Sequence, residues 1–316
     1  MPELVNPELI IPLLTACLLD AAFGDPAGLP HPVVGFGRMI SWAERRLNRG
    51  RHRKAKGALM TLLLDAAVFF AAWGLLRMIG DSPLAYLNYP LSAILIFYCL
   101  AGKTLIKEVR QVFLALERSL EDGRRQVARI VGRDTSELTA QEVRTAALET
   151  LAENLSDGVI APLFWLAIGG VPAMLTYKMV NTQDSMIGYR TPRYKDFGCW
   201  AARIDDMANY IPARLTALLM ILPYVFLRGD FSLPGFVWRN GRRHASPNSG
   251  YPEAALAGIL RCRFGGPHYY FGQLFYKPYI GENDRPLSVG DMRRAVRVNR
   301  ITEFLAVLIL LIIYSL

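Results

Sequence analysis

The sequence has 316 residues, of which 52% are hydrophobic, and its mean hydropathy of +0.22 is too high for an ordinary soluble domain. The 36 Lys and Arg residues outnumber the 27 Asp and Glu residues, so the net charge is +9. The basic residues gather beside apolar runs, which favours cytoplasmic loops near anionic lipid over nucleic acid binding. The four cysteines form no CxxC pair, so neither a zinc site nor a disulfide framework is indicated.

The first half of the chain predicts membrane segments separated by a basic loop. Residues 8–23 are apolar but short for a span. Residues 38–56 carry eight Lys or Arg and one acid, so the positive-inside rule places this loop in the cytoplasm. Residues 57–79 form the clearest span, and residues 84–106 return to the cytoplasm.

A polar region follows these spans. Residues 107–130 alternate apolar and charged positions, as a surface helix does. Residues 132–135 break this pattern, and the capping-type residues Thr139 and Glu142 predict that a helix restarts there.

Two further apolar runs, residues 159–181 and 211–227, predict membrane segments. The sequence Gly169-Gly170-Val171-Pro172 is a poor place for a continuous helix. If both runs cross, the Arg-rich loop 182–210 faces outward, against the positive-inside rule. We therefore expect a broken or re-entrant helical pair near residues 159–181.

The C-terminal part predicts a basic region and an end anchor. Residues 228–300 carry twelve Lys or Arg, and residues 247–258 and 264–272 resemble ligand-binding loops rich in Gly, Pro and aromatic residues. Residues 301–316 are an apolar run. The expected fold is an all-α polytopic membrane protein with about four to five membrane segments and sizeable cytoplasmic helical loops, in a single domain over residues 1–316.

Acidic residues flank the broken pair. Glu149, Glu153 and Asp157 are spaced four residues apart, so in a helix they lie on one face. Their like charges then repel one another. A hard cation such as Mg²⁺ offsets that repulsion. The alternative is a solvated acidic helix face, which needs no ligand.

A second polar cluster follows the apolar middle. Lys178, Asn181, Asp184 and Ser185 fall on one helical face. Asp205 and Asp206 precede the next apolar run. Basic residues occur near them: Arg190, Arg193, Lys195, Arg203 and Arg214. This composition is typical of a Mg²⁺-phosphate site, and equally of a structural ion-pair network.

Several long motifs resemble one family. They are ENLSDGVIAPLFW (153–165), KMVNTQDSMIGYR (178–190), ARIDDMANYIPARLTAL (202–218) and PNSGYPEAALAG (247–258), with weaker likeness at 24–40 and 132–138. Together they resemble the adenosylcobinamide-phosphate synthases, integral-membrane proteins of cobalamin biosynthesis. The likeness covers nearly the whole chain in order.

The resemblance implies a reaction and its components. Adenosylcobyric acid, a corrinoid, would be joined through an amide bond to an aminopropanol, as its O-phosphate, with ATP and Mg²⁺. The expected setting is the lipid bilayer of a bacterial inner membrane, with multiple spans and the active site on the cytoplasmic side. No nucleic acid partner is expected, and delivery of the corrinoid by other cobalamin-biosynthesis proteins stays open.

The motif positions suggest roles for individual residues. The expected catalytic residues are Glu153, Asp157, Lys178 and Asp184. The expected metal ligands are Glu149, Glu153, Asp157, Asp184, Asp205 and Asp206. The expected substrate- or phosphate-binding residues are Asp25, His31, Arg133, Asn154, Ser156, Asn181, Ser185, Arg190, Arg203 and Arg214.

Two rival functions remain open from the sequence. A UbiA-like membrane prenyltransferase also binds Mg²⁺-diphosphate at Asn/Asp-rich helix ends, but Asp205 and Asp206 are adjacent and lack DxxxD spacing. A corrinoid transporter or membrane scaffold without catalysis would also use a helix broken within the membrane.

Overall fold

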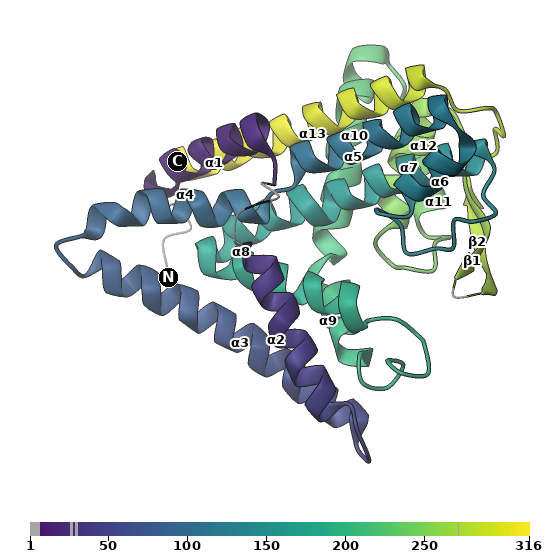
Figure 1. The fold of residues 1–316 in the computed structure, drawn as a ribbon. Coiled ribbons are helices and arrows are strands. Elements are labelled where there is room, and N and C mark those ends of the chain that lie inside the picture. The colour runs from purple at the N-terminus through teal and green to yellow at the C-terminus, as the bar shows by residue number, and fades with distance from the viewer. Residues whose placement is uncertain (1–6, 26–27, 29–30, 271) are drawn as a thin grey trace. The chain divides into compact units, whose positions relative to one another are not determined.

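The computed structural model describes residues 7–25, 28, 31–270 and 272–316, and these residues divide into two compact units. Unit 1 comprises residues 1–101, 161–209 and 308–316, and unit 2 comprises residues 102–160 and 210–307. Each unit is assembled from segments that are far apart in the sequence. The elements of both units are labelled in Figure 1.

Unit 1 is helical in its described residues. Its helices are α1 (Ile10–Phe23), α2 (Pro32–Leu47), α3 (Arg53–Gly80), α4 (Asn88–Cys99), α8 (Ala161–Ile187) and α9 (Cys199–Ala208), with 3₁₀ turns η1 (Pro7–Leu9) and η2 (Ala85–Leu87). A buried hydrogen bond from Gln183 Nε2 to Asp65 Oδ1, at 2.7 Å, ties α8 to α3. Polar groups buried among apolar helices need such partners, so this bond fixes how the two helices pair.

Unit 2 combines helices with a β-hairpin. Its elements are α5 (Gly102–Arg118), α6 (Leu120–Val127), α7 (Ala140–Leu155), the π-helical turn η3 (Ser156–Ile160), α10 (Tyr210–Arg228), α11 (Leu233–Gly241), α12 (Gly250–Leu260), β1 (Phe264–Tyr270), β2 (Gln273–Ile280) and most of α13 (Val289–Ser315). The two strands are antiparallel, with Gly266 opposite Lys277 and His268 opposite Phe275. Asp134 anchors the hairpin by donating its N–H to Tyr269 O and accepting from Gly272 N.

Among the described residues, four helical stretches are long and apolar enough to cross a membrane. They are Arg53–Gly80, Ala85–Arg118, Ala140–Ile187 and Tyr210–Arg228, and Ile10–Phe23 is a shorter apolar helix. The prediction of a helical protein with four to five membrane segments is therefore confirmed. The small hairpin is the exception to the all-α expectation.

The predicted break in the helix lies within α8. Gly169 has φ −142° and ψ 22°, and Gly170 has φ 66° and ψ −162°, so neither residue is helical. The second conformation is one that only glycine adopts without strain. Pro172 follows, where its fixed φ suits the first turn of the next helical half.

Two local predictions have different outcomes. Thr139 and Glu142 form a reciprocal capping box at the start of α7, as expected. The prediction of loops at 247–258 and 264–272 is wrong. Most of the first segment is α12, and most of the second is β1. Gly and Pro indicated loops there, but Pro252 lies in the first turn of α12, where proline is tolerated.

The packing of α3 against the chain before α9 leads to a stability prediction. A Cβ added to Gly57 would overlap the backbone carbonyl oxygen of Phe197, whereas a Cβ on Gly74 would meet nothing within 4 Å. We expect Gly57→Ala to lower the free energy of unfolding by about 1–3 kcal/mol, since a backbone oxygen cannot swing aside. Gly74→Ala on the same helix should be neutral or slightly stabilising. Apparent Tm in detergent measures both, and equal Tm values for the two variants would contradict the packing.

Candidate functional site

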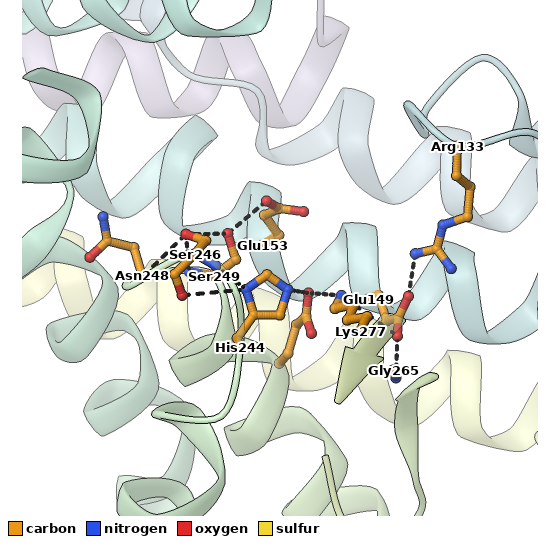
Figure 2. A network of polar contacts seen from close by, with 10 residues as sticks. Arg133, Glu149, Glu153, His244, Ser246, Asn248, Ser249, Gly265 and Lys277 are labelled. Atoms are coloured by element: carbon orange, nitrogen blue, oxygen red, sulfur yellow. Dashed lines mark hydrogen bonds and ion pairs between the residues drawn. The ribbon is translucent and has the colours of Figure 1, made fainter. Parts of the chain in front are cut away.

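A row of buried charged and polar side chains runs through unit 2 (Figure 2). Glu149 of α7 is 1% exposed. One of its carboxylate oxygens accepts a hydrogen bond from the Arg133 guanidinium, and the other accepts from the backbone N–H of Gly265 at 2.6 Å. Both oxygens of Glu149 are therefore engaged by the protein.

Lys277 brings a second cation to this row from strand β2. Its ammonium donates to Glu253 Oε1 at 2.9 Å and lies 3.9 Å from Glu149 Oε1. Burial alone would lower the pKa of Lys277, but the carboxylates of Glu149 and Glu253 outweigh it and raise the pKa. Lys277 is therefore charged at neutral pH.

The third acid of the row is Glu253 of α12, whose pKa is raised. Burial raises the pKa of Glu253 to about 8, with the charges of Glu149 and Glu153 adding to the shift and Lys277 opposing it. Two carboxylates, Glu149 and Glu253, lie within ion-pair distance of Lys277, and Glu149 also pairs with Arg133. Glu253 therefore holds a proton more readily than an ordinary glutamate, and its Oε2 has no hydrogen-bond partner among the described residues.

Two histidines beside these charges are neutral. Burial and the charge of Lys277 lower the pKa of His244 to about 4. Its Nδ1 accepts from Ser246 N at 2.9 Å, so the proton is assigned to Nε2, which lies 3.8 Å from Glu253 Oε1. Burial and Arg133 lower the pKa of His268 to about 4, and neither of its ring nitrogens has a hydrogen-bond partner in the described part of the chain.

Glu153 lies at the more open end of the row. Its Oε1 accepts from Ser249 Oγ at 2.8 Å, and Ser249 Oγ is 3.3 Å from Ser246 Oγ. Glu153 is half-buried, and its carboxylate has no cation within ion-pair distance among the described residues. Glu153 and Asp157 are the predicted catalytic acids of this unit, and both are half-buried.

The π-helical turn after α7 carries other predicted residues. Ser156 is buried, and its hydroxyl has no hydrogen-bond partner among the described residues. Asn154 and Asp157 are half-buried on the same stretch. Such single π-turns inserted in helices occur frequently at functional sites, because they reorient the side chains that follow.

The guanidinium of Arg214, which was expected to bind phosphate, contacts other parts of the protein. Its guanidinium lies 3.6 Å from the ring centroid of Tyr210 and 4.2 Å from that of Tyr251. It also donates to Asn248 Oδ1 and Pro247 O, both at 3.1 Å. Arg214 therefore holds the segment that presents Ser249 to Glu153.

A second acidic cluster lies in unit 1. Asp205 of α9 is buried, and Asn181 of α8 donates to its Oδ1 at 3.4 Å. Burial raises the pKa of Asp205 to about 7, and the nearby carboxylate of Asp184 adds to the shift. Burial also raises the pKa of Asp206, against the positive charge of Arg190. The cluster thus gathers three acids, and the charge of Arg190 acts on Asp206.

The remaining predicted residues are more dispersed within unit 1. Lys178 is half-buried on α8, whereas Ser185 and Arg190 are exposed. Arg203 is exposed, with its guanidinium 5.5 Å from the Trp200 ring centroid. His31 caps α2 by accepting from Val33 N at 3.2 Å, and its Nε2 is 3.5 Å from Asp25 Oδ1.

The donor sets were compared with the needs of Mg²⁺. Among the described residues, no group of three or more His, Cys, Asp or Glu side chains is arranged to hold a metal ion. Mg²⁺ usually takes only one or two carboxylates and completes its shell with water and substrate phosphates. The close carboxylates of Asp184 and Asp205 fit that kind of site, whereas Glu149 is already engaged by Arg133 and Gly265.

Sequence reasoning missed several members of the unit 2 row. They are His244, Ser249, Glu253, His268 and Lys277. A usable signal was present for two of them, since Glu253 and Lys277 are lone charges inside the apolar and aromatic runs YPEAALAGIL and LFYKPYI. A lone charge in such a run needs a partner, which points to a buried ion pair.

Comparison with known sequences decides the family. The sequence model of the family described as CobD/Cbib protein matches residues 13–299. The chain belongs to the CobD/CbiB family. A cobalamin biosynthesis protein CobD of Geobacter metallireducens is 48% identical over 304 residues, which cover 94% of each chain.

Other members of the CobD/CbiB family are similar over comparable lengths. CobD of Klebsiella pneumoniae is 40% identical, covering 92% of this chain and 93% of the relative. CbiB of Salmonella typhimurium is 37% identical, covering 94% of each chain. No solved structure matches the chain. The family supports a role in cobalamin biosynthesis.

The buried lysine gives a direct test of the unit 2 row. Replacing Lys277 by Met leaves Glu149 and Glu253 without their shared ammonium, and breaking a buried ion pair costs about 3–5 kcal/mol. We expect a large fall in apparent Tm for Lys277→Met in detergent. Lys195→Met, at an exposed lysine, is the control and should change Tm little. A Lys277→Met protein as stable as wild type would contradict the pairing.

The raised pKa of Glu253 gives a pH-dependent test. The folded-state pKa of Glu253, about 8, exceeds the ordinary value of 4.5, so the folded protein binds an extra proton between these pH values. This group therefore makes wild-type stability fall as pH rises from about 4.5 to 8. Glu253→Gln mimics the protonated acid, so its apparent Tm should gain on wild type from pH 5 to pH 8. A Tm difference that does not vary with pH would contradict the assignment, and Glu117→Gln at an exposed site is the control.

Proposed function

We propose that the protein joins adenosylcobyric acid to (R)-1-aminopropan-2-ol O-phosphate, or a related amino alcohol phosphate, giving adenosylcobinamide phosphate. The reaction consumes ATP and uses Mg²⁺. Membership of the CobD/CbiB family supports the pathway, and the buried acidic and basic clusters support the chemistry. The proposed setting is a bacterial inner membrane, with the site on the cytoplasmic side.

The chemistry requires activation of a carboxylate. A carboxylate is a poor electrophile, so the γ-phosphoryl group of ATP is transferred to a carboxylate oxygen, which releases ADP. The amine nitrogen then attacks the acyl carbon, inorganic phosphate leaves, and the amine loses a proton. Catalysis of phosphoryl transfer depends mainly on positioning and on charge stabilisation.

The observation that carries this proposal is the supply of closely placed acids and cations in each unit. In unit 1, Asp184 and Asp205 would hold Mg²⁺, with Asp206 beside them, and the ion would supply positive charge to neutralise phosphate. Lys178, Asn181, Ser185 and Arg190, which lie on or just after α8, would orient phosphate groups. The exposed Arg203 and the residues Asp25 and His31 are proposed contacts with substrate.

In unit 2, Glu153 is the proposed reactive acid because it has no cation partner among the described residues and is half-buried. It would orient the amine or receive its proton, with Asp157, Asn154 and Ser156 on the adjoining turn. Arg133 and Lys277 hold Glu149 and Glu253, which keeps the charge around Glu153 balanced. Arg214 positions the segment that carries Ser249.

One observation favours a second function, passage of a corrinoid or another solute. A cavity of about 630 Å³ in unit 1 adjoins the helix break and is lined by Trp73, Ser92, Gly169, Gly170 and Tyr314, among others. Broken helices beside a cavity are typical of transporters. The family relatives are named as biosynthesis proteins, so we rank catalysis first.

A coupled assay tests the proposed function. Purified full-length protein in detergent is mixed with adenosylcobyric acid, aminopropanol phosphate, ATP and Mg²⁺, while ADP and corrinoid mass are followed. Amide product with matching ADP is the expected result. A folded protein that binds the corrinoid without converting it would favour transport instead.

Matched variants test the assigned acids. Glu153→Gln and Asp184→Asn should each lower the rate by about 10²–10³-fold, since each removes a charge from the reacting groups. The controls are Glu117→Gln and Asp81→Asn, which make the same changes at exposed positions. Full activity in either site variant, with its fold intact, would remove that acid from the mechanism.

A further inference from the structure

A cationic cavity lies in unit 2 where the end of α10 meets the start of α13. Its volume is about 350 Å³, and its walls include Tyr224, Leu227, Arg228, Arg293, Arg294 and Arg297. An adjoining cavity of about 270 Å³ shares Tyr224, Arg228 and Arg294. None of these residues belongs to the buried row around Glu149.

The positive charge of this cavity is uncompensated. Among the described residues, none of the four arginines forms an ion pair with an acid. Arg228 lies over the Tyr224 ring, 5.0 Å from its centroid. Asp230 is the acid on the wall of the adjoining cavity. Its carboxylate pairs with Arg261 at 3.6 Å and accepts a hydrogen bond from Ser232 Oγ at 2.6 Å.

Because of their spacing, the arginine side chains repel one another when no anion is bound. Arg293 and Arg297 are four residues apart on α13, and Arg294 and Arg297 are three apart. Like charges at these spacings face one another and repel. A phosphate group is the ligand that arginine clusters recognise best, through paired N–H donors.

The surroundings favour an amphiphilic ligand over a soluble one. Arg228 is the last residue of α10, a helix long and apolar enough to cross a membrane. Beside it, Phe226 is 73% exposed and Leu227 is 84% exposed. Basic residues at the end of a spanning helix, next to exposed apolar side chains, lie at the depth of lipid headgroups.

We propose that this cavity binds the phosphate headgroup of an anionic phospholipid. The arginines contact the phosphate, and the exposed apolar residues at the end of α10 contact the acyl chains. The site fixes the end of α10 and the start of α13 at the membrane surface. The proposal is independent of the proposed catalytic activity.

The test measures lipid binding to delipidated, full-length protein in detergent by native mass spectrometry. The probes are phosphatidylglycerol, phosphatidylcholine and inorganic phosphate. The site variant is Arg293→Gln/Arg294→Gln/Arg297→Gln. The matched control, Arg239→Gln/Arg242→Gln/Arg243→Gln, removes the same charge from exposed arginines of unit 2 that do not line the cavity.

Wild type should bind phosphatidylglycerol at least about tenfold more tightly than phosphatidylcholine, because the arginines attract a headgroup with a net negative charge. The site variant should lose this preference and the control should keep it. Equal binding of the two lipids, or equal loss in both variants, would overturn the proposal. Displacement of the lipid by inorganic phosphate at a similar affinity would reassign the cavity to a soluble phosphate.

Apparent Tm and size-exclusion profiles establish that each variant is folded. If the triple site variant is unstable, the single change Arg294→Gln replaces it, because Arg294 lines both cavities. A folded Arg294→Gln protein with unchanged lipid preference would also overturn the proposal.

Discussion

The buried ammonium of Lys277 is the constraint on which the candidate site of unit 2 depends. A buried charge is tolerated only when it is paired, and Lys277 is paired with Glu253 and lies near Glu149. Glu149 in turn engages Arg133 and the backbone of Gly265. These contacts join the hairpin, α7, α12 and the segment before α7. The pairing of the buried charges therefore depends on the packing of these elements, and the packing depends on the pairing.

The same balance explains why the acids of the site differ in character. Glu149 has both carboxylate oxygens engaged, the pKa of Glu253 is raised, and Glu153 contacts a hydroxyl group among the described residues. Neighbouring acids with different protonation states are typical of catalytic sites, because one can accept a proton while another stays ionised. In the acidic cluster of unit 1, burial raises the pKa of Asp205 and of Asp206, and the charge of Asp184 adds to the shift of Asp205.

The arginines of unit 2 have two different surroundings. Arg133 and Arg214 are committed to contacts inside unit 2, with Glu149 and with the 247–248 segment. The arginines at the start of α13 have no acidic partner among the described residues and line a cavity beside a spanning helix. Net charge alone would not separate these two uses.

The sequence by itself determined the features that depend on neighbouring residues. The apolar runs predicted the spans, the Gly169-Gly170-Val171-Pro172 sequence predicted the break in α8, and Thr139 with Glu142 predicted the cap of α7. Each rests on local hydropathy, backbone freedom or capping. The motifs also gave the family, which the comparisons confirmed.

Only the tertiary structure decided which distant charges meet. Lys277 and Glu253 belong to a strand and a helix that looked like parts of binding loops, and Glu149 lies far earlier in the chain. Gly and Pro were ambiguous signals there, because they occur in helix starts and hairpins as well as in loops. The partner of a buried charge is set by packing between elements remote in sequence, and no local pattern encodes that packing.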